Sequence, residues 1–497
     1  MNPPDHRPAI HDARPRTDAN DDDRALRRLG YEPQLRRRMS AFSNFALSLS
    51  IICILAGGIT SFHVGLGGVG GAGIGIGWPV GCLFSLAVAS SMAHIASAFP
   101  TAGGLYHWGS ILGGRGLGWA TAWFNLAGLV TVLATVNAGT YDFALAATGW
   151  TPPMGRESEV KTALVLAMVL SQGWLNHRGM RWATRLTNLS GWLILALASV
   201  LVVGLLSTSP SPDLSRLWRF ENFSGATHGG AGFPRTENLA WLFALGLMLP
   251  AYTITGFDAS AHTAEETVRA SENVPRGILR SVIVSSLAGW ALVAAILLAL
   301  PSVAEGVRKG AEVVPWVVFL RIPRLPALLL MAGIVLVQYL CGLAALTSAS
   351  RMVFAFARDG GLPLSPWLSK VDPATGCPAI AVWVAALSGA AFTLLVPYTT
   401  IAVVCTVFLY LSYVLPVAAG WRAWGSTWTR PGSWSLGNAF KPLAAVSVLG
   451  CAVLLVVGIQ PPNQLALPIV LGASLVMGVV WLAWERRRFK GPPRAGP

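Results

Sequence analysis

Two carboxylates lie well inside long apolar segments of the sequence, at Asp142 and Asp258. If those segments cross a bilayer, a charged carboxylate near mid-depth costs about 3 kcal/mol, so such a residue is usually functional, or neutral and hydrogen-bonded. Asp258 ends a segment rich in Gly and Thr, whereas Asp142 lies nearer the end of its apolar segment, where water can solvate it. We therefore predict a role in ion coupling or gating for Asp258, and Asp142 is a second candidate for that role.

Two apolar segments are interrupted by residues that disfavour a helix interior. One contains Gly57-Gly58-Ile59-Thr60-Ser61, and the other contains Thr253-Ile254-Thr255-Gly256-Phe257-Asp258. Glycine lowers helix propensity by about 1 kcal/mol relative to alanine, and Ser or Thr hydroxyls can satisfy backbone groups that unwinding releases. Each segment indicates a broken membrane helix, although close helix packing through small residues would also favour Gly and Thr.

Matching interruptions in two halves of a chain point to a binding site between the breaks. Unwinding exposes amide donors and carbonyl acceptors near mid-membrane, where they can hold a zwitterion or a small cation. Aromatic rings at Tyr252 and Phe257 can cover an aliphatic or cationic part of such a ligand. The predicted substrate-binding residues are Gly57, Gly58, Ile59, Thr60, Tyr252, Thr253, Thr255, Gly256 and Phe257.

A further set of hydroxyls, at Thr347, Ser348 and Ser350, falls on one or two adjacent faces of a predicted helix. With carbonyl groups of the first broken helix, these hydroxyls can form a sodium site, and their alternative role is helix packing. The coupling ion, proton or sodium, stays open. The six cysteines show no CxxC or Cys/His spacing, so we expect neither a cofactor nor a metal site.

The composition of the chain indicates what kind of protein holds these residues in place. Of the 497 residues 54% are hydrophobic and 12% are charged, and the mean hydropathy is +0.57. A soluble domain is about a quarter charged, so a soluble protein is excluded. The net charge of +14 comes from short Lys and Arg clusters between apolar runs, without the basic face that nucleic-acid binding needs. The partners expected are therefore a lipid bilayer and a small molecule, and not nucleic acid.

Apolar runs of about 17 to 25 residues recur from Phe42 onward, and each is long enough to cross a bilayer as a helix. We predict an all-α polytopic protein with about twelve transmembrane helices. Loops on one face carry nine Lys and Arg, against twenty close to span ends on the other face. The richer face is predicted to be cytoplasmic, which places both termini inside a cell membrane.

The predicted organisation divides the chain at the ends of these spans. It comprises a disordered cytoplasmic tail over 1–40, spans 1 to 5 over 41–207, an external loop over 208–238, spans 6 to 10 over 239–421, spans 11 and 12 over 422–485, and a basic cytoplasmic tail over 486–497.

Three stretches resemble signatures of one family, the amino acid, polyamine and organocation permeases. They are Gly256-Phe257-Asp258-Ala259 with the following Glu265-Glu266-Thr267 and Pro275-Arg276-Gly277-Ile278, then Phe99 to Trp108, and Ser350 to Pro363. The entry segment Leu29 to Arg37 and the run Ala251 to His262 are most similar to the amino acid/choline branch, which includes GABA and choline permeases.

This resemblance implies the five-plus-five inverted repeat of the bacterial leucine transporter, with broken helices 1 and 6 and two additional spans. It also implies secondary active transport of amino acids or small amines by alternating access. Many relatives carry Gly-Ser-Gly in the first break, where this chain has Gly57-Gly58-Ile59-Thr60. A choline, polyamine or GABA-type organocation permease, or an exchanger, is therefore the alternative. A membrane-embedded enzyme or a channel is disfavoured, because the sequence shows no matched catalytic set, charged ring or filter motif.

Overall fold

The computed structural model describes residues 18–210, 212–225, 233–461 and 463–493. Every regular element in this part of the chain is a helix, and extended pairing is limited to isolated bridges such as Met39 with Thr267. Nine helical segments of the described residues are long and apolar enough to cross a membrane, and two shorter apolar helices accompany them. The predicted all-α polytopic architecture is confirmed.

The first five predicted spans correspond to eight helices. The bounds are α2 (Ala41–Ile52), α3 (Gly57–Thr60) and α4 (Phe62–Val69) for span 1, α5 (Gly71–Gly75) and α6 (Gly77–Ala98) for span 2, then α8 (Arg115–Thr148), α9 (Glu157–His177) and α10 (Met180–Ser207). The short α7 (Leu105–Gly113) links spans 2 and 3. Helix α9, the fourth predicted span, is not among the nine strongly apolar segments.

The remaining spans follow the same order. Their bounds are α11 (Leu239–Gly246), α12 (Met248–Thr253) and α13 (Ala259–His262) for span 6, then α14 (Ala270–Ala299), α17 (Arg324–Arg358), α19 (Ala379–Leu395), α20 (Tyr398–Ala423), α21 (Phe440–Gly458) and α22 (Ala466–Val480). The connecting helices are α15 (Val303–Lys309), α16 (Val313–Arg321) and α18 (Ser365–Leu368). A π-helical turn, Trp481–Glu485, and α23 (Arg486–Arg488) follow α22.

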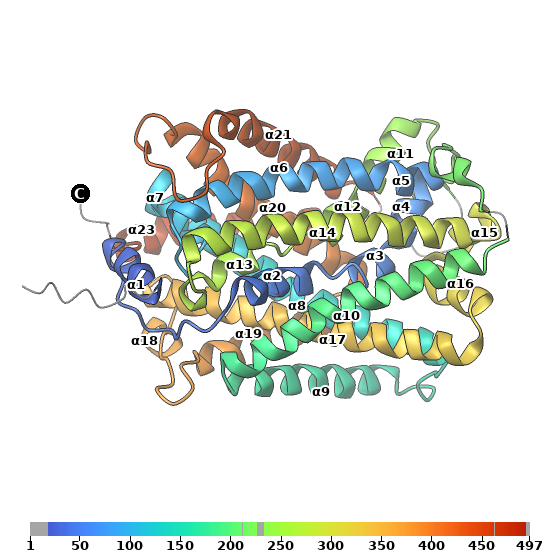
Figure 1. Cartoon of the computed structure of the whole chain (residues 1–497), viewed down its shortest axis with the longest axis horizontal. Coiled ribbons are helices and arrows are strands. Elements are labelled where there is room, and N and C mark those ends of the chain that lie inside the picture. Colours follow the sequence, from blue (N-terminus) through green and yellow to red (C-terminus); the bar gives the residue numbers. More distant parts are fainter. Residues whose placement is uncertain (1–17, 211, 226–232, 462, 494–497) are drawn as a thin grey trace, which may run out of the picture.

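The long helices run along the long axis of the molecule, so the bundle has two distinct ends (Figure 1). Helices α1 (Asp18–Arg28), α7, α18 and α23 gather at one end, which we call the tail end. Helices α4, α15 and α16 lie at the opposite end, the far end. Helix α8 packs against both α17 and α20 in the interior. The last span, by contrast, is only 11% buried, which suits a helix that faces lipid.

The predicted disorder of residues 1–40 is wrong for residues 18–40, and residues 1–17 lie outside the described part. Helix α1 and the segment after it pack on the tail end through Leu26, Tyr31, Leu35 and Met39, each at most 6% exposed. These side chains recur every four or five residues, so one face of the segment is buried while its many charges stay at the surface. The overall charge of the segment concealed this pattern.

Candidate substrate site

The second predicted break is present in span 6. Helix α12 ends at Thr253 and α13 begins at Ala259. Between them Gly256 adopts a φ of +85°, and a Cβ at this position would collide with Ile51 of α2. The hydroxyls of Thr253 and Thr255 donate to the carbonyls of Leu249 and Tyr252 at 2.8 and 2.7 Å. The threonines therefore satisfy backbone groups around the break, and the glycine permits the turn.

The break in span 1 lies earlier than predicted. Helix α2 ends at Ile52, and the four residues Gly57–Thr60 form the helical turn α3, so the unwound stretch is Cys53 to Ala56. Cys53 itself has a positive φ of 26°. A Cβ on Gly57 would lie 3.0 Å from the Cα atom of Thr253, so this glycine permits close helix packing and not unwinding. Placing the break at Gly57-Gly58-Ile59-Thr60 was wrong for this reason.

The two broken spans lie side by side. Ser48 of α2 donates from its hydroxyl to the Phe257 carbonyl at 2.9 Å. The Ser48 hydroxyl oxygen also accepts from the Ser260 amide at 3.0 Å. The Asn44 side chain donates to the Ser260 carbonyl at 2.9 Å. The first half of span 1 is therefore fixed to the second half of span 6 by side-chain bonds to backbone groups that the break leaves unpaired.

Asp258 is fully buried and lies within hydrogen-bond distance of side chains from three helices. Asn125 of α8 donates at 2.9 Å and the Tyr413 hydroxyl of α20 donates at 2.7 Å, while His262 Nε2 lies 3.1 Å away. Tyr413 also accepts from the Gly256 amide at 3.1 Å. Among the described residues, side chains and not backbone amides bond the carboxylate, and Tyr413 joins it to the break. This arrangement offsets part of the cost of an acid in the membrane interior.

The predicted ion site is not assembled in the described structure. The Thr347 hydroxyl donates to Asn176 of α9 at 2.7 Å, and the Ser350 hydroxyl donates to the Thr347 carbonyl at 2.8 Å. Ser348 is buried, and its hydroxyl has no hydrogen-bond partner among the described residues. The first break is contacted instead from an earlier turn of α17, where Gln338 donates to the Leu55 carbonyl at 3.1 Å.

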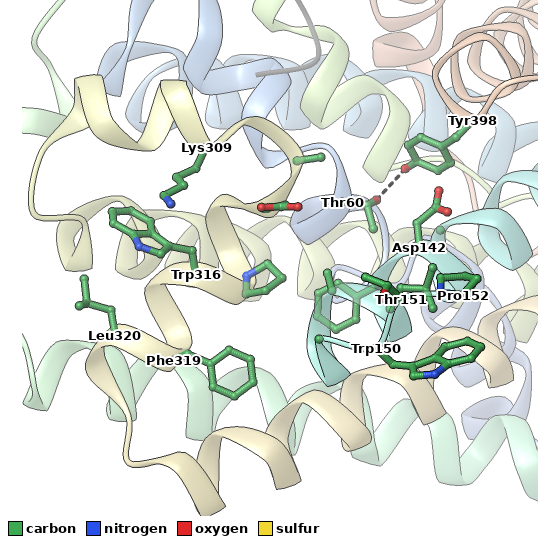
Figure 2. Close-up of a pocket in the computed structure, with 18 residues that line it drawn as sticks. Thr60, Asp142, Trp150, Thr151, Pro152, Lys309, Trp316, Phe319, Leu320 and Tyr398 are labelled. Carbon is green, nitrogen blue, oxygen red and sulfur yellow. Dashed lines mark hydrogen bonds between the residues drawn. The ribbon is translucent and has the colours of Figure 1, made fainter. Parts of the chain in front are cut away.

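A cavity of about 910 Å³ opens at the far end between α3, α8, α16 and α20 (Figure 2). Two of the predicted functional residues, Thr60 and Asp142, line it, and Tyr398 donates from its hydroxyl to Thr60 at 2.8 Å. Phe257 does not line the cavity, because its ring is buried against Tyr413 with 4.9 Å between centroids. The cavity therefore reaches the end of α3 and stops short of the second break.

The Amino acid permease family model matches residues 39–482, from the last residues before α2 into the final span. The chain belongs to the amino acid permease family. It is 32% identical to amino-acid permease BAT1 of Arabidopsis thaliana, over 94% of this chain and 95% of that relative. It is also similar to the GABA-specific permease of Saccharomyces cerevisiae, at 26% identity over 95% of this chain and 86% of that relative. The thiamine transporter thi9 of Schizosaccharomyces pombe is 27% identical to it, over 90% of this chain and 81% of that relative.

The tail end of this permease is closed by ion pairs. Arg351 of α17 pairs with Glu266 at 3.0 Å, and both side chains are at most 1% exposed. Further along α17, Arg358 donates to both carboxylate oxygens of Glu265 at 3.0 Å. These pairs join α17 to the turn that follows α13, and therefore close the bundle directly below the second break.

Asp359 connects the chain's first segment to this closure. Its carboxylate accepts from the hydroxyls of Tyr31 and Tyr106 at 2.7 and 2.8 Å. Burial raises the pKa of Asp359, although the neighbouring Arg358 guanidinium and the two hydroxyls act in the opposite direction. Arg358 also lies over the Tyr31 ring, 4.1 Å from its centroid. The segment after α1 therefore forms part of the closed tail end of the permease.

Several residues that complete the site carry only a weak signal in the sequence. Asn125 and Tyr413, the partners of Asp258, are 133 and 155 residues away from it in the chain. Tyr398 is separated from Thr60 by 338 residues. An isolated Asn or Tyr in an apolar segment is a weak signal, and no local spacing relates it to a distant acid. Gln338 offered a similar signal, a lone amide within a long apolar run.

Proposed function

We propose that this permease is a secondary active transporter for amino acids or small amines, working by alternating access with an ion-coupled step. The observation that supports the proposal is the pair of broken helices lying side by side, beneath a cavity at the far end and above a closed tail end. Broken helices leave backbone donors and acceptors for a substrate without burying two full charges. The amino-acid and GABA permeases among its relatives are consistent with this substrate class.

We place the substrate between the first break, Cys53 to Ala56, and the second, Ile254 to Asp258. Gly256→Leu, which inserts a side chain against Ile51, should abolish uptake by proteoliposomes of a radiolabelled amino acid and amine panel. Gly472→Leu is the matched control, because a Cβ at Gly472 meets nothing within 4 Å. Normal uptake by the Gly256 variant, or equal loss in both folded variants, would contradict this placement. Uptake that requires internal substrate would identify an exchanger.

We further propose that the tail end is cytoplasmic, since the larger share of Lys and Arg close to the spans lies on that face. Arg178→Cys, between α9 and α10, should react with an impermeant maleimide only after cells are permeabilised. Met154→Cys, at a residue 97% exposed between α8 and α9, should react in intact cells. The reverse pattern would place the termini outside the cell.

We assign Asp258 to gating and coupling, because its carboxylate joins the second break to α8 and α20. With pH and sodium gradients imposed separately, Asp258→Asn should lose pH-driven accumulation and retain substrate exchange. Tyr413→Phe removes one donor and keeps the acid, so it should retain accumulation at a lower rate. Loss of exchange together with accumulation in Asp258→Asn would identify a structural clamp. Accumulation driven by a pH gradient in that variant would show that Asp258 is not the coupling residue.

A further inference from the structure

The far-end cavity contains a carboxylate with no direct partner in the described structure. Asp142 lies on α8, its side chain is exposed to the cavity, and it forms no hydrogen bond or ion pair with any described residue. The cation that acts on it electrostatically is Lys161, whose ammonium group lies over the Tyr141 ring, 5.9 Å from the centroid. The Asp142 carboxylate is therefore available to a ligand that enters the cavity.

Two hydroxyls lie beside this carboxylate and connect it to the first break. Figure 2 shows Asp142 next to Tyr398 and Thr60, which are joined by their 2.8 Å hydrogen bond. The Thr60 hydroxyl in turn donates to the carbonyl of Ala56 at 2.8 Å. Ala56 is the last residue of the unwound stretch in span 1. A ligand that engages these oxygens therefore acts on a hydrogen-bonded chain that ends in the break.

The other charged residues of the cavity favour one orientation of a ligand. Lys309 lies across the cavity from Asp142, with its ammonium group 5.4 Å from the centroid of the Trp316 ring (Figure 2). Glu312 is the second acid of the lining. The wall formed by Asp142, Thr60 and Tyr398 presents side-chain oxygen atoms and no cation. An ammonium group supplies three N–H donors to such a wall, whereas a carboxylate would meet like charge.

We propose that Asp142, Thr60 and Tyr398 form an outer binding site for the ammonium group of the substrate. The substrate occupies this site, amine first, before the Tyr398–Thr60 hydrogen bond opens and admits it to the breaks. The proposal rests on the transport function above and specifies its substrate class: molecules with a protonated amine, whether amino acids or simple amines, and not anions that lack one.

Protection of a cysteine in the cavity tests occupancy without transport. Ala146 lines the same cavity and is exposed, and the six native cysteines are buried. In full-length Ala146→Cys protein in proteoliposomes, n-butylammonium should slow labelling by an impermeant maleimide by about tenfold, and butyrate should not. Adding Asp142→Asn should remove the protection, whereas Asp142→Glu should retain it. Glu312→Gln is the matched control and should leave protection unchanged, because that acid lies on the turn before α16 and not on α3, α8 or α20, which carry the proposed wall.

Each rate is expressed relative to the rate without ligand in the same variant, so a change in cysteine reactivity does not affect the comparison. Equal protection with and without the Asp142→Asn substitution, protection by butyrate as strong as by n-butylammonium, or equal loss in Glu312→Gln would overturn the proposal. In uptake assays Asp142→Asn should raise KM about tenfold with little change in maximal rate. Protection without uptake of any substrate would instead count against the proposed transport function and leave the ammonium site standing.

Discussion

The two ends of the helical bundle are closed to very different degrees. At the far end a cavity of about 910 Å³ descends to Thr60, and the hydrogen bond from Tyr398 crosses its deep end. At the tail end two buried ion pairs, Arg351 with Glu266 and Arg358 with Glu265, join α17 to the turn after α13. Burying ion pairs is costly unless the geometry is good, so the tail-end pairs must be well matched to persist.

The difference indicates that this conformation represents the half of a transport cycle that is open at the far end and closed at the tail end. An alternating-access permease must close the far end and open the tail end in its other state. In our proposal, tail-end opening separates buried charges, whereas far-end closure adds apolar and hydroxyl contacts around an existing cavity. The two changes must nearly balance for the cycle to run, because populations shift by a factor of ten for each 1.4 kcal/mol or so. Changes at the tail end are therefore the more informative perturbations.

The largest effect is expected from Glu266→Gln. The substitution leaves the fully buried Arg351 without its counter-charge, which costs about 3–5 kcal/mol of folding free energy. Thermal unfolding of the purified protein in detergent measures the loss. Glu272→Gln is the control, since its pairs with Arg269 and Arg276 are partly exposed and worth about 1 kcal/mol or less. Similar shifts in the two variants would show that the closed tail end does not depend on buried charge.

The spans and the second break were predictable because their signals are local. Bilayer thickness sets the length of an apolar helix, and Gly256 marks a backbone conformation that other residues rarely adopt. The first break was misplaced because its left-handed residue is Cys53, whereas the adjacent glycines serve helix packing. Local composition cannot separate these two uses of glycine.

The contacts that complete the site were not predictable from one sequence. Asp258 was identified as an intramembrane acid, but two of its three partners, Asn125 and Tyr413, come from helices more than a hundred residues away. The order of residues 18–40 was missed because their apolar side chains are dispersed among charges. The hydroxyls of Thr347 and Ser350 were identified as polar groups on a helix, but neighbouring helices decide what they bond.

A smaller effect is expected from Tyr31→Phe, which removes one tail-end hydrogen bond to Asp359. A bond to a charged acceptor is worth about 1.5–3 kcal/mol, so its loss should favour the state that is open at the tail end. This energy shifts the equilibrium between the two states by about tenfold or more, so far-end labelling at Ala146→Cys should slow. Tyr339→Phe is the matched control, because it removes a 2.8 Å bond to Ser171 between α17 and α9, outside both closures. Unchanged labelling in Tyr31→Phe alongside normal folding would show that the first segment does not hold the tail end closed.

The smallest effect is a pH dependence at Asp359, where Arg358 and two hydroxyls act against the effect of burial on the pKa. The pKa of an unperturbed Asp is about 3.9, and burial raises the pKa of Asp359 in the folded protein. A raised pKa means that the folded state binds the proton more tightly than the unfolded state. The stability contributed by protonation is therefore complete below about pH 3.9 and is lost as the pH rises through the folded-state pKa. Asp359→Asn stays neutral throughout, so the melting temperature of the unmodified protein should fall relative to this variant as the pH rises above about 4. Parallel curves would mean that the Tyr31 and Tyr106 hydroxyls and Arg358 stabilise the charged carboxylate fully, and the tail end would then be insensitive to pH at this residue.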